Sequence, residues 1–161
     1  MLENGAQAWC FGSSQYVQAA VKNVECYLEK SGKKLPARAE TPIQTSYRPE
    51  LDVTPELQPT DAAYFMSLIG IARWIVELGR VDICLEVSML SSHLALPRYG
   101  HLEQLYHIFA YLKRHHNAEM VFDPSDPVVD ESQFEERDWT TTAFGHVQGK
   151  EQLPPLSLIH I

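Results

Sequence analysis

The run Lys113-Arg114-His115-His116 is the densest group of side chains in this chain that suits contact with an anion. Arg and Lys donate charge-assisted hydrogen bonds to phosphate oxygens. A second explanation needs no ligand, because bases at the carboxyl end of a helix stabilise its macrodipole. The run therefore marks a candidate binding surface, a helix terminus, or both.

The spacing of the histidines argues against a metal site. Two ligands on one face of a helix lie three or four residues apart. His101 and His107 are six positions apart, and His115 and His116 are adjacent, so neither pair is expected to chelate a metal. We predict that this chain holds no metal ion.

Motifs of known catalytic mechanism are missing from the sequence. It contains no glycine-rich phosphate loop, no His-Glu-x-x-His and no Gly-x-Ser-x-Gly. Asp82 lies two positions after Arg80, which is a possible site pair, but a helix cap beside a surface base explains these residues better. We therefore predict no catalytic residue.

The charge of the chain is unevenly distributed. The formal net charge of −8 by itself argues against nucleic-acid binding. However, eight acidic residues and only one base lie between positions 118 and 138. Because that segment is expected to be extended, the average charge does not exclude a basic surface on the folded part.

Cysteine usage and hydropathy indicate the compartment. Cys10, Cys26 and Cys84 are odd in number and widely spaced, which predicts free thiols, mostly as small core residues, in a reducing environment. The apolar run 64–78 is too short and too charged to span a bilayer, and no signal peptide is visible. We expect an intracellular protein, cytoplasmic or nuclear, with no membrane partner.

Three predicted helices position the candidate residues. The first covers about 62–78 and is apolar almost all round, which is typical of a helix without a solvent face. The second (about 82–95) and the third (about 100–115) each carry one apolar stripe at spacings of three and four. We expect Thr60-Asp61 to cap the start of the first helix and Gly79 to end it. Asp82 is expected to cap the start of the second helix, and Pro97 to end it.

The flanking segments are simpler. We expect a short strand over 6–11 and a serine-capped helix over 15–28, with Tyr16, Ala20, Val24 and Leu28 on its apolar stripe. Five prolines in 33–60 indicate an extended connector, and a short strand is expected at 120–122. The predicted fold is mainly α, with a three-helix unit over 61–122. A strand and helix (1–32) and the proline-rich connector (33–60) precede that unit, and a largely extended acidic tail (123–161) follows it.

Several short motifs in one order resemble the polyprotein of copia-type LTR retrotransposons, in the region between the reverse transcriptase palm and RNase H. The resemblance covers roughly residues 9–122 and includes a Tyr shortly before S-L-I-G-x-x-x-W, then R-x-D-I, V-S-x-L-S, P-x-x-x-H and Y-L-K. The matching residues are Tyr64, Ser67, Leu68, Ile69, Gly70 and Trp74, then Arg80, Asp82 and Ile83, then Val87, Ser88, Leu90 and Ser91, then Pro97 and His101, and finally Tyr111, Leu112 and Lys113. Upstream, Ser14-Gln15-Tyr16-Val17 resembles a motif at the start of a helix in the family, and Thr41-Pro42 resembles the Thr-Pro that follows that helix.

The resemblance implies a fragment without catalytic groups of its own. The polymerase Asp-Asp signature of the family is expected before residue 1, and no Asp-Asp pair occurs in the chain. The RNase H carboxylates are expected after residue 149, and the last residues (157–161) resemble translated sequencing adaptor. The fragment would be the end of the palm, the thumb and the connection towards RNase H. Mg²⁺ is expected for the intact polymerase and no cofactor for this fragment.

Two functions follow from that placement. In such polymerases the helical thumb grips the template–primer duplex, so the resemblance implies contacts to an RNA–DNA or DNA duplex within the intact polyprotein. The expected contacts are Lys113 and Arg114, then Arg98, with His101 and His115 as weaker polar contacts. The alternative is a packing module that contacts the adjacent palm or RNase H domain and no nucleic acid.

Overall fold

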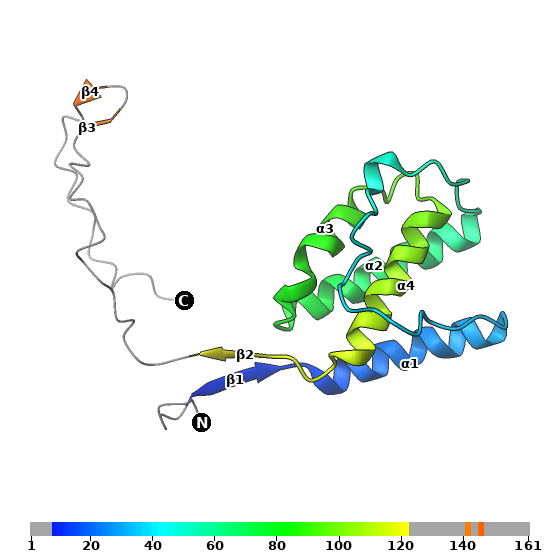
Figure 1. Cartoon of the computed structure of the whole chain (residues 1–161), viewed down its shortest axis with the longest axis horizontal. Coiled ribbons are helices and arrows are strands. Elements are labelled where there is room, and N and C mark those ends of the chain that lie inside the picture. The colour runs from blue at the N-terminus through cyan, green and yellow to red at the C-terminus, as the bar shows by residue number, and fades with distance from the viewer. Residues whose placement is uncertain (1–7, 123–140, 143–144, 147–161) are drawn as a thin grey trace. The chain divides into compact units, whose positions relative to one another are not determined.

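A computed structural model describes residues 8–122, 141–142 and 145–146 of this chain (Figure 1). The chain divides into two units, residues 1–124 and 125–161. In the second unit, β3 (Thr141–Thr142) pairs antiparallel with β4 (Gly145–His146). Apart from this pair, the predicted acidic tail and the adaptor-like residues 157–161 lie outside the described residues.

The first unit is mainly α, as predicted. Its described residues form four α-helices, two short 3₁₀ turns and one pair of strands. The helices are α1 (Ser14–Lys30), α2 (Pro59–Glu77), α3 (Cys84–Ser91) and α4 (Tyr99–Arg114), and the 3₁₀ turns are η1 (Pro49–Leu51) and η2 (Val81–Ile83).

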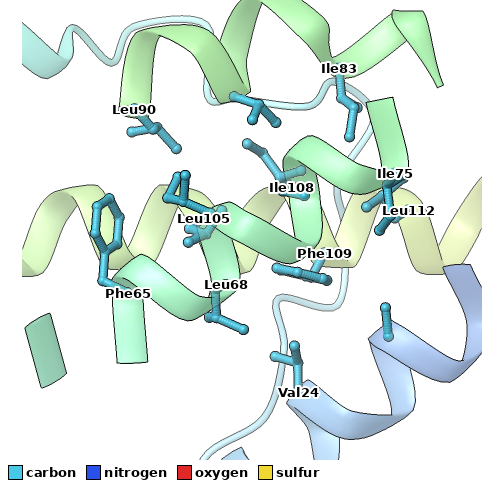
Figure 2. Packing of buried hydrophobic residues seen from close by; sticks show 14 of the residues in the cluster. Val24, Phe65, Leu68, Ile75, Ile83, Leu90, Leu105, Ile108, Phe109 and Leu112 are labelled. Atoms are coloured by element: carbon cyan, nitrogen blue, oxygen red, sulfur yellow. The ribbon is translucent and has the colours of Figure 1, made fainter. Parts of the chain in front are cut away.

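Helix α4 is central to the hydrophobic core. Figure 2 shows its side chains Leu105, Ile108, Phe109 and Leu112 among those of the neighbouring helices. On one side of α4 lie the buried side chains of α2, and on another those of η2 and α3. Burial of this apolar surface is the main stabilising contribution to the fold. The buried partners from these elements include Phe65, Leu68, Ile69, Ala72, Ile75, Ile83, Val87 and Leu90.

Helix α1 belongs to the same core. Its buried side chains are part of the single cluster that α2, α3 and α4 form. The predicted boundaries near residues 32 and 60 therefore do not separate packing units, and the helical unit has four helices instead of three. The predicted stripe was partly wrong, because Tyr16 is 38% exposed. The buried residues of α1 are Val17, Ala20, Val21, Val24 and Leu28.

Two of the predicted helix caps are wrong. Pro59 occupies the first turn of α2, so the helix begins before Thr60 and Asp61. Helix α3 begins only at Cys84, after η2, and Asp82 does not cap it. The reason is a competing partner, since the Asp82 carboxylate accepts hydrogen bonds from Arg80. Helix α3 also ends earlier than predicted, at Ser91.

The end of α2 is formed at Gly79, close to where the sequence placed it. The Gly79 amide donates to Val76 O (2.9 Å) and the Arg80 amide to Ile75 O (3.2 Å), which is the Schellman arrangement. Gly79 has φ +96°, and a Cβ there would lie 2.7 Å from Phe11 Cδ1. Both the backbone conformation and the neighbouring ring therefore require glycine.

Helix α2 does have a solvent face, contrary to prediction. Met66 and Trp74 are exposed by 50% and 54%, and Gly70, Arg73 and Glu77 continue the same exposed stripe. The apolar residues of this stripe are thus not part of the core.

The three cysteines were also expected mostly in the core, but each is a free thiol at the surface. Over the described residues, no helix is long and apolar enough to cross a membrane.

Both predicted strands form, and they pair with each other. β1 (Trp9–Gly12) runs antiparallel to β2 (Glu119–Phe122), with Trp9 opposite Phe122 (Figure 1). The segment before α1 and the segment after α4 therefore lie side by side. The structure of these described strands is a two-stranded ribbon.

Candidate nucleic-acid interface

The amino end of α4 is fastened to the connector between α1 and α2. The Arg98 guanidinium donates to Thr54 O (2.6 Å), and the Gly100 amide donates to Thr54 Oγ1 (2.9 Å). Glu56 and Arg98 form an isolated antiparallel bridge. The connector around Thr54 and Glu56 is thus held against the start of α4 by backbone and side-chain hydrogen bonds. Most of the Arg98 side chain is covered.

The structure removes His101 from the candidate contacts. Its side chain is 1% exposed, and both ring nitrogens have partners. Nδ1 accepts from the Arg98 amide (3.1 Å), so Nε2 must carry the proton that it donates to Pro49 O (3.1 Å). Burial lowers the pKa of His101 below its ordinary value, which agrees with this neutral ring. His101 therefore holds the helix start together and has no atom free for a phosphate.

Asp52 completes the network at this helix start. Its carboxylate accepts from the Tyr47 hydroxyl and from the Thr54 amide (2.8 Å). Burial alone would raise the pKa of Asp52, but the hydrogen bonds from Thr54 and Tyr47 outweigh burial and lower it. The carboxylate lies so close to α4 that a Cβ at Gly100 would be 1.8 Å from Asp52 Oδ2.

At the carboxyl end of α4, the two leading candidate bases are at the surface but paired with acids. Lys113 Nζ lies 2.7 Å from Glu25 Oε1, and its side chain is 59% exposed. The Arg114 guanidinium donates to Glu40, and its side chain is 51% exposed. Both cations can therefore meet a solvent-borne ligand, but each already has a carboxylate partner from another element.

A groove of about 620 Å³ brings these bases together with two others that were not predicted from the sequence. It lies between the end of α1, the start of the connector and the last turns of α4. Lys33 and Lys34 line it beside Lys113 and Arg114, and neither forms an ion pair within the described part of the chain. The acids of the groove are Glu25 and Glu29. A lysine pair directly after a helix-ending glycine was the signal in the sequence.

The two histidines after these bases have different surroundings. The His115 ring packs against the Tyr111 ring at a tilt of 38°, with 4.6 Å between ring centroids, and its Nε2 is buried. His116 Nδ1 contacts Ser14 Oγ and Gln18 Nε2, both at 3.0 Å, at the start of α1. Neither histidine lines the groove. His115 was predicted as a weaker contact, and the structure places it outside this group of bases.

Arg80, which is buried, forms an ion pair with Asp82, whose side chain is 33% exposed. Arg80 is 1% exposed and donates from Nε (2.9 Å) and Nη2 (2.7 Å) to the two oxygens of Asp82. The Tyr111 hydroxyl of α4 donates to the same carboxylate. Burial would raise the pKa of Asp82, but Arg80 and Tyr111 outweigh burial and lower it. The surface base expected at Arg80 is thus a buried cation that joins η2 to α4.

Within residues 8–122 and the two short described strands of the tail, no three His, Cys, Asp or Glu side chains gather to hold a metal ion. Nothing matches this chain in comparisons with protein-family models, with curated proteins or with solved structures.

Proposed function

We propose that the helical unit grips a template–primer duplex, as a part of a retrotransposon reverse transcriptase that lacks the catalytic carboxylates. One observation carries the proposal: the fold assembles Lys33, Lys34, Lys113 and Arg114 around one groove from two distant parts of the sequence. Cations along a groove bind the phosphate backbone without reading bases. A polymerase that copies any template needs that kind of contact.

The charge of the folded unit is compatible with this role. Residues 8–122 carry 11 Lys and Arg and 12 Asp and Glu, so their formal net charge is −1 out of −8 for the whole chain. Most of the net negative charge therefore lies outside residues 8–122. Local attraction at the groove therefore has to overcome only a small opposing charge on the unit itself.

A salt titration tests the proposal. We expect the full chain to bind a fluorescently labelled RNA–DNA hybrid at low ionic strength, measured by anisotropy. Changing Lys33, Lys34, Lys113 and Arg114 together to Gln should weaken binding and reduce the slope of log affinity against log salt by roughly three to four, about 0.9 for each phosphate that is no longer neutralised. Binding should be the same for unrelated hybrid sequences.

The matched control changes bases that lie away from the groove. Lys22 and Arg48 are exposed and line none of it. Lys22→Gln with Arg48→Gln should leave the slope unchanged. A flat titration for the folded wild-type chain at low salt, where attraction is greatest, would remove the duplex grip.

An exposed apolar surface favours a second candidate function, packing against an adjacent palm or RNase H domain. On the β1–β2 ribbon, Trp9 is 83% exposed and Phe122, its cross-strand partner, is 54% exposed. A two-stranded ribbon is marginally stable in water by itself, and covering its aromatic side chains with a partner would be favourable.

This second function has a separate test. Trp9→Ser with Phe122→Ser should weaken binding to the isolated palm or RNase H domain of a copia-type reverse transcriptase, measured by calorimetry, and should not alter hybrid binding. Equal binding of wild type and variant, or binding by neither, would contradict the packing function.

A further inference from the structure

Two acids beside the groove already contact the bases of α4. Glu25 of α1 contacts Lys113 Nζ, and Glu40 of the connector contacts Arg114. These are contacts between elements, not within one helix turn. Each α4 cation of the proposed grip is therefore already neutralised in the free protein.

The two ion pairs are accessible enough to open. The Glu25 and Glu40 side chains are 32% and 59% exposed, and those of Lys113 and Arg114 are more than half exposed. Exposed pairs of this kind are weak, because water and salt screen them. Glu40 also lies 4.0 Å from Arg38 Nε, so it keeps a cationic neighbour after Arg114 leaves.

We propose that Glu25 and Glu40 are internal competitors for the phosphate backbone, so that the duplex binds by exchanging partners with them. This inference rests on the proposed duplex grip and adds its regulation. In the free protein, Lys113 and Arg114 are held by carboxylates. In the complex, each base moves to a phosphate and is no longer paired with its acid. The acids thereby lower the affinity of the grip, which suits a surface that must release and re-form contacts along a duplex.

Removing the two acids should strengthen binding. We expect Glu25→Gln with Glu40→Gln to bind the labelled hybrid roughly two- to thirtyfold more tightly, because each exposed ion pair of this kind opposes binding by a factor of about 1.4 to 5.4. The gain should be largest at low salt and shrink as salt rises, since salt also weakens the pairs. Circular dichroism of the free variants should match wild type.

Two controls separate partner exchange from a general change in charge. Glu77→Gln with Glu103→Gln alters the net charge by the same amount at exposed acids that form no ion pair in the described part of the chain. This variant should gain little affinity. The Glu25 and Glu40 substitutions should also have no effect when Lys113→Gln and Arg114→Gln are already present, because no exchange is then left to make.

The outcomes distinguish the two proposals. If wild type and all variants fail to bind the hybrid, the duplex grip and the competition both fail. If wild type binds and the Glu25 and Glu40 substitutions change nothing, or if Glu77→Gln with Glu103→Gln tightens binding equally, the grip stands and the competition is wrong. Tighter binding by the Glu25 and Glu40 variant than by wild type, with no such gain for the Glu77 and Glu103 control, would support the competition.

Discussion

Arg80 was predicted at the surface from its sequence pattern, but the structure buries it. Two residues of opposite charge at positions 80 and 82 look like a surface base and a helix cap, but the structure makes them a counter-ion pair at the edge of the core. Burial of Arg80 depends on tertiary packing of η2 against α2 and α4, which no local pattern reveals. In contrast, the surface position of Lys113 and Arg114 was predictable, because Lys and Arg are mostly exposed and both lie in the last turn of α4.

The first prediction concerns this pair. Asp82→Ala leaves a guanidinium in the interior without its counter-ion, and we expect a loss of about 3 kcal/mol or more in the free energy of unfolding. Replacing both partners, Arg80→Met with Asp82→Leu, should recover most of that loss, because no unpaired charge remains. Urea unfolding followed by circular dichroism measures both. A double variant no more stable than Asp82→Ala would contradict this explanation.

The partners of the groove bases could not be predicted from the sequence for a related reason. Glu25 lies 88 positions from Lys113, and Glu40 lies 74 positions from Arg114. The unfolded chain can bring several acids near Lys113 or Arg114. Which acid becomes the partner is decided only when the helices pack. Lys33 and Lys34 likewise join the site only because the end of α1 lies beside α4.

At the scale of elements, the sequence pattern located the four helices and both strands described in the first unit, but it predicted the helix ends less accurately. Hydrophobic stripes are set by burial over many residues, so they survive local exceptions. Helix ends depend on single hydrogen bonds, and the Asp82 carboxylate bonds to Arg80 instead of capping α3. The connector, which was predicted to be extended, contains the 3₁₀ turn η1, and its hydrogen bonds to the start of α4 were not foreseen, since they join residues more than 40 positions apart.

The second prediction compares two helical glycines. Gly100→Ala would place a Cβ against Asp52, which Tyr47 and Thr54 hold in position, so unfolding should become easier by roughly 1–3 kcal/mol. Gly70 of α2 has no atom within 4 Å of an added Cβ. Gly70→Ala should therefore stabilise the fold by roughly 0.5–1 kcal/mol. Thermal melts of the two variants measure these opposite shifts, and equal shifts would show that Asp52 gives way.

For the whole molecule, the main surprise is that α1 is part of the core. The proline-rich connector separates α1 from the other helices in the sequence, which suggests a boundary there. A boundary in composition is not a boundary in packing, however, and the apolar stripe of α1 needs a partner that α4 supplies.

The third prediction follows from this shared core. Leu28→Ala in α1 should lower the free energy of unfolding by about 2–5 kcal/mol, and far-UV circular dichroism and tryptophan fluorescence should report the same single transition. Tyr16→Ala, on the exposed side of α1, is the control and should change stability little. Two separate transitions in wild type would mean that α1 folds independently of α2–α4.

The β1–β2 ribbon places the first and last described residues of the helical unit next to each other, since Trp9 lies opposite Phe122. A fold whose two ends meet can be inserted into a loop of another protein without forcing that loop apart, and its ends can be joined and new ones opened elsewhere. Residues 8–122 thus have a geometry that suits insertion into another protein and circular permutation. Cutting such a circularised chain in the connector would show whether the order of the helices along the chain matters to the fold at all.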